Sequence, residues 1–364
     1  MVNKMQKGIN RGINQVTSEQ ALEGPKDSFN EEIDMNLELI KKRIKKDLVI
    51  DSLEIGNYTK TKVNVLSIET ITKKEIKEEI IKKLEKIRVD GIIDSSYLKK
   101  YLQEKESTFP TIISTERPDK ASMALLEGKI IILVDNSPYS LILPNFLQDF
   151  FHTTDDYYQK PINTSFIRII RLISFLIAIY LPGFYLSVTT RNYNLIPLSL
   201  LLTLKAGRTL VPFPAYIEAL LLIISFEILK ESDFRKTNST STSISILGGL
   251  ILGDAAVAAG IVSPIMIIVI AISSISGLIF PSVELGNTIR YYKILFLILS
   301  TILGIIGIIL GSILLIIDLF KMKTFGYHYL LIDKNEILDS ILKINKKIQK
   351  RNKKLTENEI RGEQ

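Results

Sequence analysis

The feature that most constrains this chain is a stretch of 29 uncharged residues between Asp254 and Glu284. An apolar run of roughly 18 residues or more is typical of membrane segments. Ser263-Pro264 divides the stretch and Phe280-Pro281 ends it, so the sequence predicts two helices. The first half is rich in small residues, which let helices approach closely in lipid: Gly248, Gly249, Gly253, Ala255, Ala256, Ala258, Ala259 and Gly260.

Asp254 lies within this run of small residues. A carboxylate at membrane depth is costly and usually faces a partner or a water-filled space. On the helix expected over 244–262, Asp254, Val257, Ala258 and Ile261 share one face and are candidates for lining a pore. In a ring of subunits, Asp254 would attract cations and Val257 or Ile261 would form an apolar constriction. The alternative is that these residues only pack against a helix and that Asp254 is a helix-end residue or bonds a partner.

Two further runs are long enough to cross a hydrocarbon core, which takes about 20 residues. Leu172 to Thr190 is uncharged and follows Arg168 and Arg171, which place the preceding region in the cytoplasm. Ile294 to Ile317 is uncharged over 24 residues and is expected to be one span. Its glycines are spaced for close helix contact: Gly304, Gly307 and Gly311.

The region from residue 192 to 229 is less regular. Charges and prolines interrupt residues 192–214 after about half a span, which favours a re-entrant or interfacial segment. Residues 215–229 continue as a helix, on which Glu218 and Glu227 are intramembrane carboxylates on similar faces. Residues 283–293 are expected to form a short loop. If both termini are cytoplasmic, the number of crossings is even, so one of the five apolar segments does not cross.

The first 160 residues predict an α+β region. Apolar residues at helical spacing indicate helices at 30–46, 73–87 and 95–104, and LVIDSLEIG and TKVNVLSIE predict a β-hairpin. A second unit has a helix from Pro118 to Gly128 and strands at 129–134 and 139–143. The aromatic linker 147–161 is either an interfacial belt or packed on the soluble region.

These patterns give an α+β N-terminal region of two small subdomains, followed by an all-α polytopic membrane domain. The expected boundaries are 1–106 and 107–160 for the subdomains, 161–325 for a membrane domain with four to five apolar segments, and 326–364 for a basic cytoplasmic tail. Within the tail, residues 335–354 form an amphipathic basic helix suited to an anionic leaflet.

Charge and composition exclude several classes of function. Residues 1–165 are nearly neutral, whereas the excess of Lys and Arg lies in the membrane flanks and the tail, which favours anionic lipid over nucleic acid as a partner. The chain has no cysteine, and His152 and His328 lie far apart, so no metal site is expected. No motif predicts catalysis or a cofactor, and we expect no enzyme activity.

Six separated strings make a family resemblance specific: EGPKDSF, TERPDKASMALLEGKIIILVDNSPYSLILP, DDYYQKP, VPFPAYIEALL, GDAAVAAGIVSP and FGYHYL. In this order and spacing they resemble the GerA family of spore germination proteins, the A subunits of germinant receptors. The resemblance implies an integral protein of the spore inner membrane with cytoplasmic N-terminal subdomains. It also implies a permease-like B subunit and a lipoprotein C subunit as partners, and a homo-oligomer, a pentamer, that forms a nutrient-gated cation channel.

The chain departs from the family pattern in three places. The family usually has a longer N-terminal subdomain than the 22 residues before Glu23, so we expect a shortened first subdomain. Ile223 stands where the family tends to have a second Glu, and residues 234–238 replace a typical Arg-Leu-Pro. Two other functions stay open, a non-conducting scaffold and a germination-amplifying relative that does not sense nutrient.

Overall fold

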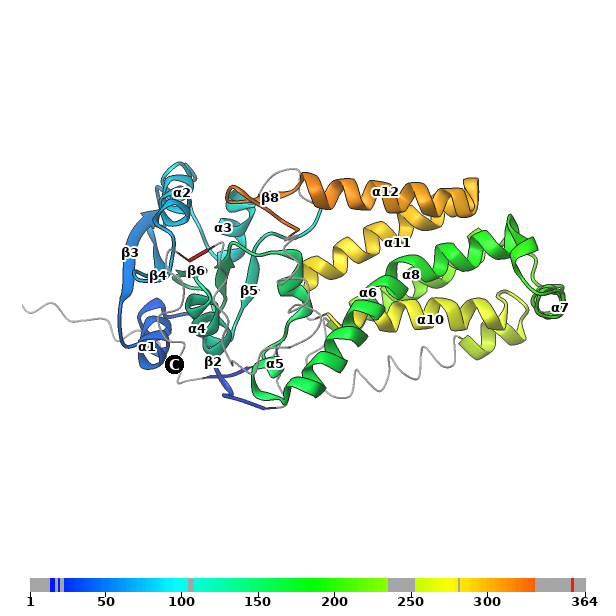
Figure 1. Ribbon diagram of the computed structural model, residues 1–364, viewed down its shortest axis with the longest axis horizontal. Coiled ribbons are helices and arrows are strands. Elements are labelled where there is room, and N and C mark those ends of the chain that lie inside the picture. Colours follow the sequence, from blue (N-terminus) through cyan, green and yellow to red (C-terminus); the bar gives the residue numbers. More distant parts are fainter. Residues whose placement is uncertain are drawn as a thin grey trace, which may run out of the picture. The chain divides into compact units, whose positions relative to one another are not determined.

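A computed structural model describes residues 14–16, 19, 23–103, 108–234, 253–280, 282–330 and 355–356. The chain divides into two compact units. The first, the α/β unit, comprises residues 1–169 and 319–364, and the second, the helical unit, comprises residues 170–318. Figure 1 labels the elements of both.

A five-stranded antiparallel sheet organises the α/β unit, in the order β3-β4-β6-β7-β5. The predicted hairpin is present, because Leu48 of β3 pairs with Ile68 of β4 and Ile55 with Thr61. The strands are β3 (Leu48–Ile55), β4 (Thr61–Ile68), β5 (Ile113–Thr115), β6 (Ile130–Val134) and β7 (Ser140–Leu143), and a separate short pair joins β1 (Asn14–Gln15) to β2 (Asp27–Ser28).

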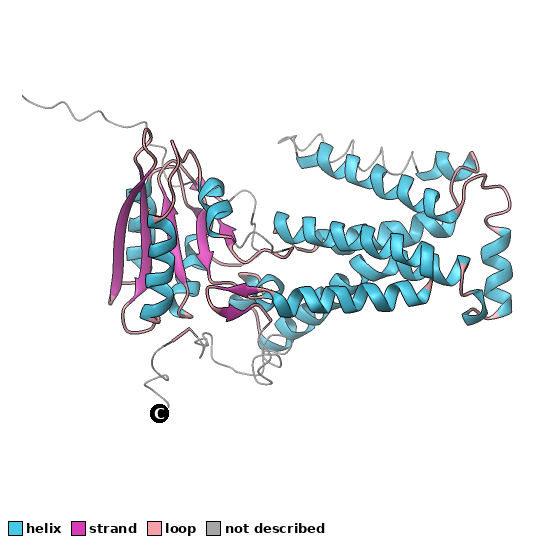
Figure 2. Cartoon of the chain, turned by 90° about the horizontal axis from the view of Figure 1, so that it is seen from above, coloured by secondary structure: helices cyan, strands magenta, loops and turns pink. Residues whose placement is uncertain are grey.

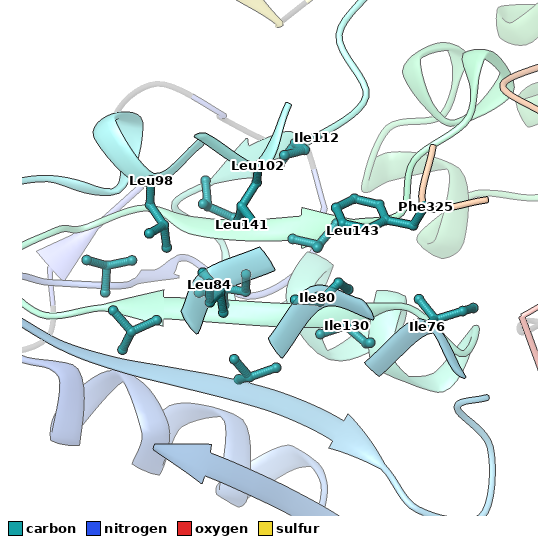
Figure 3. Close-up of a cluster of buried hydrophobic side chains, with 14 of the residues drawn as sticks. Ile76, Ile80, Leu84, Leu98, Leu102, Ile112, Ile130, Leu141, Leu143 and Phe325 are labelled. Carbon is teal, nitrogen blue, oxygen red and sulfur yellow. The ribbon is translucent and has the colours of Figure 1, made fainter. Parts of the chain in front are cut away.

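Helices cover both faces of this sheet. The helices α1 (Ile33–Arg43) and α4 (Pro118–Leu126) pack on one face. Apolar residues of α2 (Lys74–Glu85) and α3 (Ser95–Leu102) join those of the other face in one core cluster (Figure 3). All residues of β6 are therefore buried, which explains its continuous apolar sequence Ile-Ile-Ile-Leu-Val.

The sheet corrects the prediction of two separate subdomains with a boundary at residues 106 and 107. The ladder between β4 and β6 pairs Val63 with Val134 and Leu66 with Ile131, so strands from both predicted subdomains form one sheet. This pairing joins residues far apart in sequence, and local patterns carry no signal for it. Figure 2 shows these strands in magenta beside their covering helices.

The chain returns to the α/β unit after the helical unit. Strands β8 (Lys323–Thr324) and β9 (Tyr327–His328) form a short pair, and Phe325 and Leu355 are buried in the core cluster. The Tyr329 hydroxyl donates a hydrogen bond of 2.9 Å to the carbonyl oxygen of Pro110. The expected boundary at residues 325 and 326 is thus too late, because this unit already includes Leu319. The helix expected at 335–354 lies outside the described residues.

The linker to the helical unit packs on the α/β unit. It contains η1 (Leu147–Phe151) and α5 (Asp155–Tyr158). Phe150 and Phe151 are buried, and Tyr157 donates a hydrogen bond of 2.6 Å to Glu127. Of the two alternatives for this linker, the structure shows the packed one.

The helical unit contains long helices that run beside one another (Figure 2). They are α6 (Pro161–Thr190, which begins in the α/β unit), α7 (Leu198–Ala206), α8 (Ala215–Phe234), α10 (Pro264–Leu278), α11 (Val283–Leu303) and α12 (Ile305–Lys321), with the short η2 (Tyr193–Leu195). By length and composition, one helix within the described part of the chain, α6, could cross a membrane. The helix α7 is only nine residues long, in agreement with the expected interruption at residues 192–214.

The expected span from Ile294 to Ile317 is wrong, because the structure divides it into a helical hairpin. Gly304 ends α11 with a φ of 62°, a left-handed conformation that glycine adopts readily. The side chain of Asn192 accepts a hydrogen bond of 3.0 Å from the backbone N–H of Ile305 and caps α12. Tyr292 of α11 then donates to Asp318 of α12 at 2.6 Å.

Residues 283–293, expected to be a loop, form the first turns of α11. The hydroxyl of Ser282 accepts a hydrogen bond from the backbone N–H of Leu285 and caps the helix. Leu285, Ile289 and Tyr292 are buried at helical spacing. Asn287 and Tyr291 lie on the exposed face of the helix, and polar residues such as these give this segment the composition of a loop.

Candidate functional site

The helical unit contains a buried carboxylate at the break between two helices. Glu218, in the first turn of α8, is fully buried. Its Oε1 accepts a hydrogen bond from the backbone N–H of Ser263 and another from the Ser263 hydroxyl, each of 2.6 Å. Ser263 is the N-cap of α10, so Glu218 satisfies a donor at the start of that helix.

A cation completes this site. Nη2 of Arg208 lies 3.3 Å from Oε2 of Glu218, which gives the carboxylate a neutralising partner. Arg208 follows α7, and the buried hydroxyl of Tyr185 from α6 lies nearby. Apolar residues of α6, α8, α10 and α11 surround the site in one cluster that includes Leu186, Leu222 and Met266. The arrangement connects the interrupted segment after α7 to α8 and α10.

The predicted pore-lining residues differ in their surroundings. Residues 253–258 are helical, and Gly260 ends this helix with a φ of 67°. Asp254, Ala258 and Ile261 are exposed in the single chain, whereas Val257 packs against the apolar cluster. Residues 244–252 of the expected helix lie outside the described part. Ile261 lies beyond the end of this helix, so the predicted face is wrong for Ile261 and comprises Asp254, Val257 and Ala258, of which Asp254 and Ala258 are exposed.

The second predicted carboxylate, Glu227, does not meet Glu218. Its Oε2 lies 2.6 Å from Nη2 of Arg290 on α11. Glu218 and Glu227 thus bind different partners, although both lie on α8. Ile223, between them, is buried in the apolar cluster, where a carboxylate would need its own partner.

Sequence reasoning missed the partners of both carboxylates. In the sequence, Arg208 is one of the charges that interrupt residues 192–214, and Ser263 belongs to a predicted helix break. Arg290 and Lys293 lie within residues 283–293, for which the sequence predicts a loop. A charge inside an apolar region needs an opposite charge, so counting the Arg and Lys residues there would have suggested the pairing with Glu218 and Glu227.

The α/β unit contains two buried charge clusters with a structural role. Arg117 is paired with Asp119 at 2.8 Å, and Tyr158 donates to the same carboxylate at 3.0 Å. Burial opposes ionisation of Asp119, but these hydrogen bonds outweigh it and lower its pKa. Burial and the nearby Asp119 charge raise the pKa of Tyr158 to about 12.

In the second cluster, Lys129 lies 2.9 Å from Asp149 and 3.7 Å from Glu127. Burial alone would lower the pKa of Lys129, but the two carboxylates raise it. Burial raises the pKa of Glu127. These groups bond one another and hold the linker on the sheet. Within the described residues, no group of three His, Cys, Asp or Glu side chains could hold a metal ion.

Comparison with known proteins gives a consistent set of relatives. The family model described as Bacillus/Clostridium GerA spore germination protein matches residues 1–355. Spore germination protein KA of Bacillus subtilis (strain 168) is 35% identical over 327 residues, which cover 89% of this chain and 60% of the relative. Spore germination protein GerQA of Bacillus cereus is 38% identical over 322 residues, which cover 88% of this chain and 64% of the relative. The chain thus spans less than two thirds of the length of these two relatives.

A solved structure is also similar over part of the chain. It is the N-terminal domain of the A subunit of the Bacillus megaterium spore germinant receptor GerK3. The similarity covers 32% of this chain and 94% of that domain, with 40% sequence identity and a TM-score of 0.27.

Proposed function

The chain belongs to the GerA family of spore germination proteins, and we propose that it is the A subunit of a germinant receptor in the spore inner membrane. In this proposal it makes and breaks no covalent bond. It assembles as a homo-oligomer, with five copies as the family resemblance implies, and forms a nutrient-gated cation channel. A permease-like B subunit and a lipoprotein C subunit are its partners, and nutrient recognition lies mainly on the B subunit.

The observation that carries the channel proposal is the buried Glu218 at a break between helices. Broken helices with a buried carboxylate are typical of ion pathways in membrane proteins, where the irregular backbone lies beside a cavity. Arg208 neutralises Glu218 in the single chain. The cation-attracting group of the proposed pore is therefore Asp254, which is exposed and comes shortly before the same break.

Oligomerisation would bring the exposed Asp254 face of each copy toward a common axis. Five carboxylates around an axis attract cations, and the apolar side chain of Val257 provides a constriction that gates by dewetting. Val257 packs on the apolar cluster that also surrounds Glu218, so a change at that site could be transmitted to the constriction. This coupling gives the proposed gate a physical connection to the helix break.

Ion flux through proteoliposomes tests conduction. The full-length protein, reconstituted with its B and C subunits, should release K⁺ from loaded liposomes when nutrient is added. Assembly of the receptor without any flux would support the non-conducting scaffold instead. Flux that needs no nutrient and no B subunit would support the germination-amplifying relative.

Cysteine labelling tests the orientation of the α/β unit, which we propose faces the cytoplasm. The chain has no cysteine, so a single Lys42→Cys variant in the exposed face of α1 provides a unique label site. An impermeant maleimide should label it only after the membrane is opened. Labelling from outside intact cells would overturn this orientation.

A further inference from the structure

A cluster of charges lies between α8, α10 and α11, away from Glu218. Its members line a cavity of about 60 Å³ together with Ser274 and with apolar residues that include Phe226 and Ile289. Three of the charges are positive and one is negative: Lys230 and Glu227 from α8, and Arg290 and Lys293 from α11.

Two cations of this cavity, Arg290 and Lys293, are not fully paired within the described residues. Glu227 pairs with Nη2 of Arg290 at 2.6 Å, but Nε of Arg290 is buried and has no acceptor among the described residues. Lys293 is only 4% exposed, and within that part of the chain no hydrogen bond joins its amine to an acceptor. Glu227 is the carboxylate close enough to attract it, while Lys230 and Arg290 repel it. A buried charge is costly unless it is paired, so the cavity lacks an anion.

We propose that this cavity binds the phosphate of an anionic phospholipid headgroup. Phosphate oxygens accept charge-assisted hydrogen bonds from Arg and Lys, and they would supply acceptors to Nε of Arg290 and to the amine of Lys293. The cavity has room for a small anionic group but is well below the roughly 300 Å³ and above of pockets that hold drug-sized ligands. A drug-sized ligand is therefore excluded as the occupant.

The surroundings favour a lipid over a free phosphate ion. Leu278, which lines the cavity at the end of α10, is exposed, and so are Val283 and Tyr291 on α11, the helix that carries Arg290 and Lys293. Acyl chains would cover these side chains while the phosphate occupies the cavity. In the membrane proposed for this unit, lipids surround the cavity, so their headgroups supply phosphate beside it.

Titration of the purified full-length protein in neutral detergent tests this site. Bound lipid is counted by native mass spectrometry with phosphatidylglycerol, with phosphatidylcholine of the same chains, and with inorganic phosphate in a separate series. Wild-type protein should prefer phosphatidylglycerol. Lys293→Met and Arg290→Gln should each weaken that binding about fivefold, as expected for removing one Lys or Arg near an anionic lipid.

Two further variants distinguish binding from a merely structural role. Glu227→Gln removes the negative charge that competes with the phosphate, so it should strengthen phosphatidylglycerol binding. Lys321→Met, at the exposed end of α12, removes the same charge elsewhere and should leave binding unchanged. Lys293→Met also removes a buried charge, so it should raise the melting temperature in neutral detergent while it reduces stabilisation by phosphatidylglycerol.

Several outcomes would overturn the proposal. Equal binding of the two lipids would exclude a headgroup site, and so would a loss in Lys321→Met as large as in Lys293→Met. Weaker binding by Glu227→Gln would show that this carboxylate supports the site and does not compete with an anion. If inorganic phosphate binds with the same dependence on Arg290 and Lys293 and phosphatidylglycerol shows no preference, the site takes a free anion and the lipid assignment is wrong.

Discussion

Glu218 and Ser263 are joined by two hydrogen bonds of 2.6 Å, one from the backbone N–H and one from the hydroxyl of Ser263. One carboxylate oxygen thereby fixes the start of α10 against the first turn of α8. The other oxygen faces Arg208, so three segments separated in sequence meet at one side chain. This site should therefore contribute strongly to the stability of the helical unit.

We predict that Glu218→Ala lowers the free energy of unfolding by about 3 kcal/mol, because it leaves a cation and a helix-capping donor without their partner. Ser263→Ala removes one hydroxyl contact and the α10 cap and should cost about 1 kcal/mol. Thermal unfolding of the full-length protein in detergent measures both. Ser225→Ala is the control, since the Ser225 hydroxyl donates to the Leu221 carbonyl oxygen within the same helix. An equal effect in all three variants would contradict the role of Glu218.

The helical hairpin of α11 and α12 gives a second prediction, at Gly307. A Cβ at this position would overlap the carbonyl oxygen of Leu299 on α11, whereas a Cβ at Gly253 would meet no atom within 4 Å. Gly307→Ala should therefore destabilise the protein by about 1 to 3 kcal/mol through overpacking, and Gly253→Ala should be tolerated.

The same pair of variants distinguishes the hairpin from one continuous span. In an uninterrupted helix from Ile294 to Ile317, Gly307→Ala would stabilise by up to about 1 kcal/mol, because alanine has the higher helix propensity. Thermal unfolding of the two variants in detergent shows whether each replacement stabilises or destabilises the protein. A stabilised Gly307→Ala protein would contradict the hairpin.

Local signals in the sequence predicted much of the α/β unit. Alternating apolar residues indicated the hairpin of β3 and β4, and Pro118 and Gly128 marked the two ends of α4. Each of these features depends on residues close together in the chain. The pairing of β4 with β6 and the return of Leu355 to the core depend on distant segments, so the sequence suggested separate subdomains and a separate tail.

In the helical unit, too, local features were predictable from the sequence and contacts between distant segments were not. The break at Ser263-Pro264 was predictable, because proline at the first turn and serine at the N-cap are local signals. The break at Gly304 was not, because a glycine in an apolar run is also typical of close helix packing. The break at Gly304 depends on Asn192, a residue distant in the sequence that caps the start of α12.

Asp119 predicts an acid-dependent loss of stability in the α/β unit. Its pKa is lower in the folded protein than in the unfolded chain, despite burial, because of hydrogen bonds from Arg117 and Tyr158. The ionised carboxylate therefore contributes stability that is complete above the unfolded pKa of about 3.9. That contribution is lost as the pH falls through the lower, folded-state pKa.

Acid titration followed by circular dichroism tests this prediction. Asp119→Asn leaves Arg117 buried without its charge partner and should cost about 3 kcal/mol at neutral pH. Its stability should then fall less than that of wild type as the pH is lowered below about 4. Asp34 is exposed and pairs with Lys62, so Asp34→Asn is the matched control. The stability of this variant should depend on pH in the same way as that of the wild type. Parallel acid profiles for wild type and Asp119→Asn would contradict the prediction.

Val257 gives the test of the proposed pore. It shares a helix face with the exposed Asp254, and it packs partly against the apolar cluster of the helical unit. In a pore of several copies, Val257→Ala widens an apolar constriction and weakens the dewetting that keeps it closed. We predict that liposomes with this variant lose K⁺ without nutrient, and that spores carrying it lose dormancy.

Ile275→Val is the control, because Ile275 is an exposed apolar residue on α10 outside the predicted pore face and the replacement also shortens an apolar side chain. It should leave K⁺ retention unchanged. If Val257 serves only in packing, its replacement destabilises by about 0.5 to 1.5 kcal/mol and causes no leak. Spores with Val257→Ala that stay dormant, with normal protein levels and an unchanged response to nutrient, would remove Val257 from the pore and leave its contact with the apolar cluster as its role.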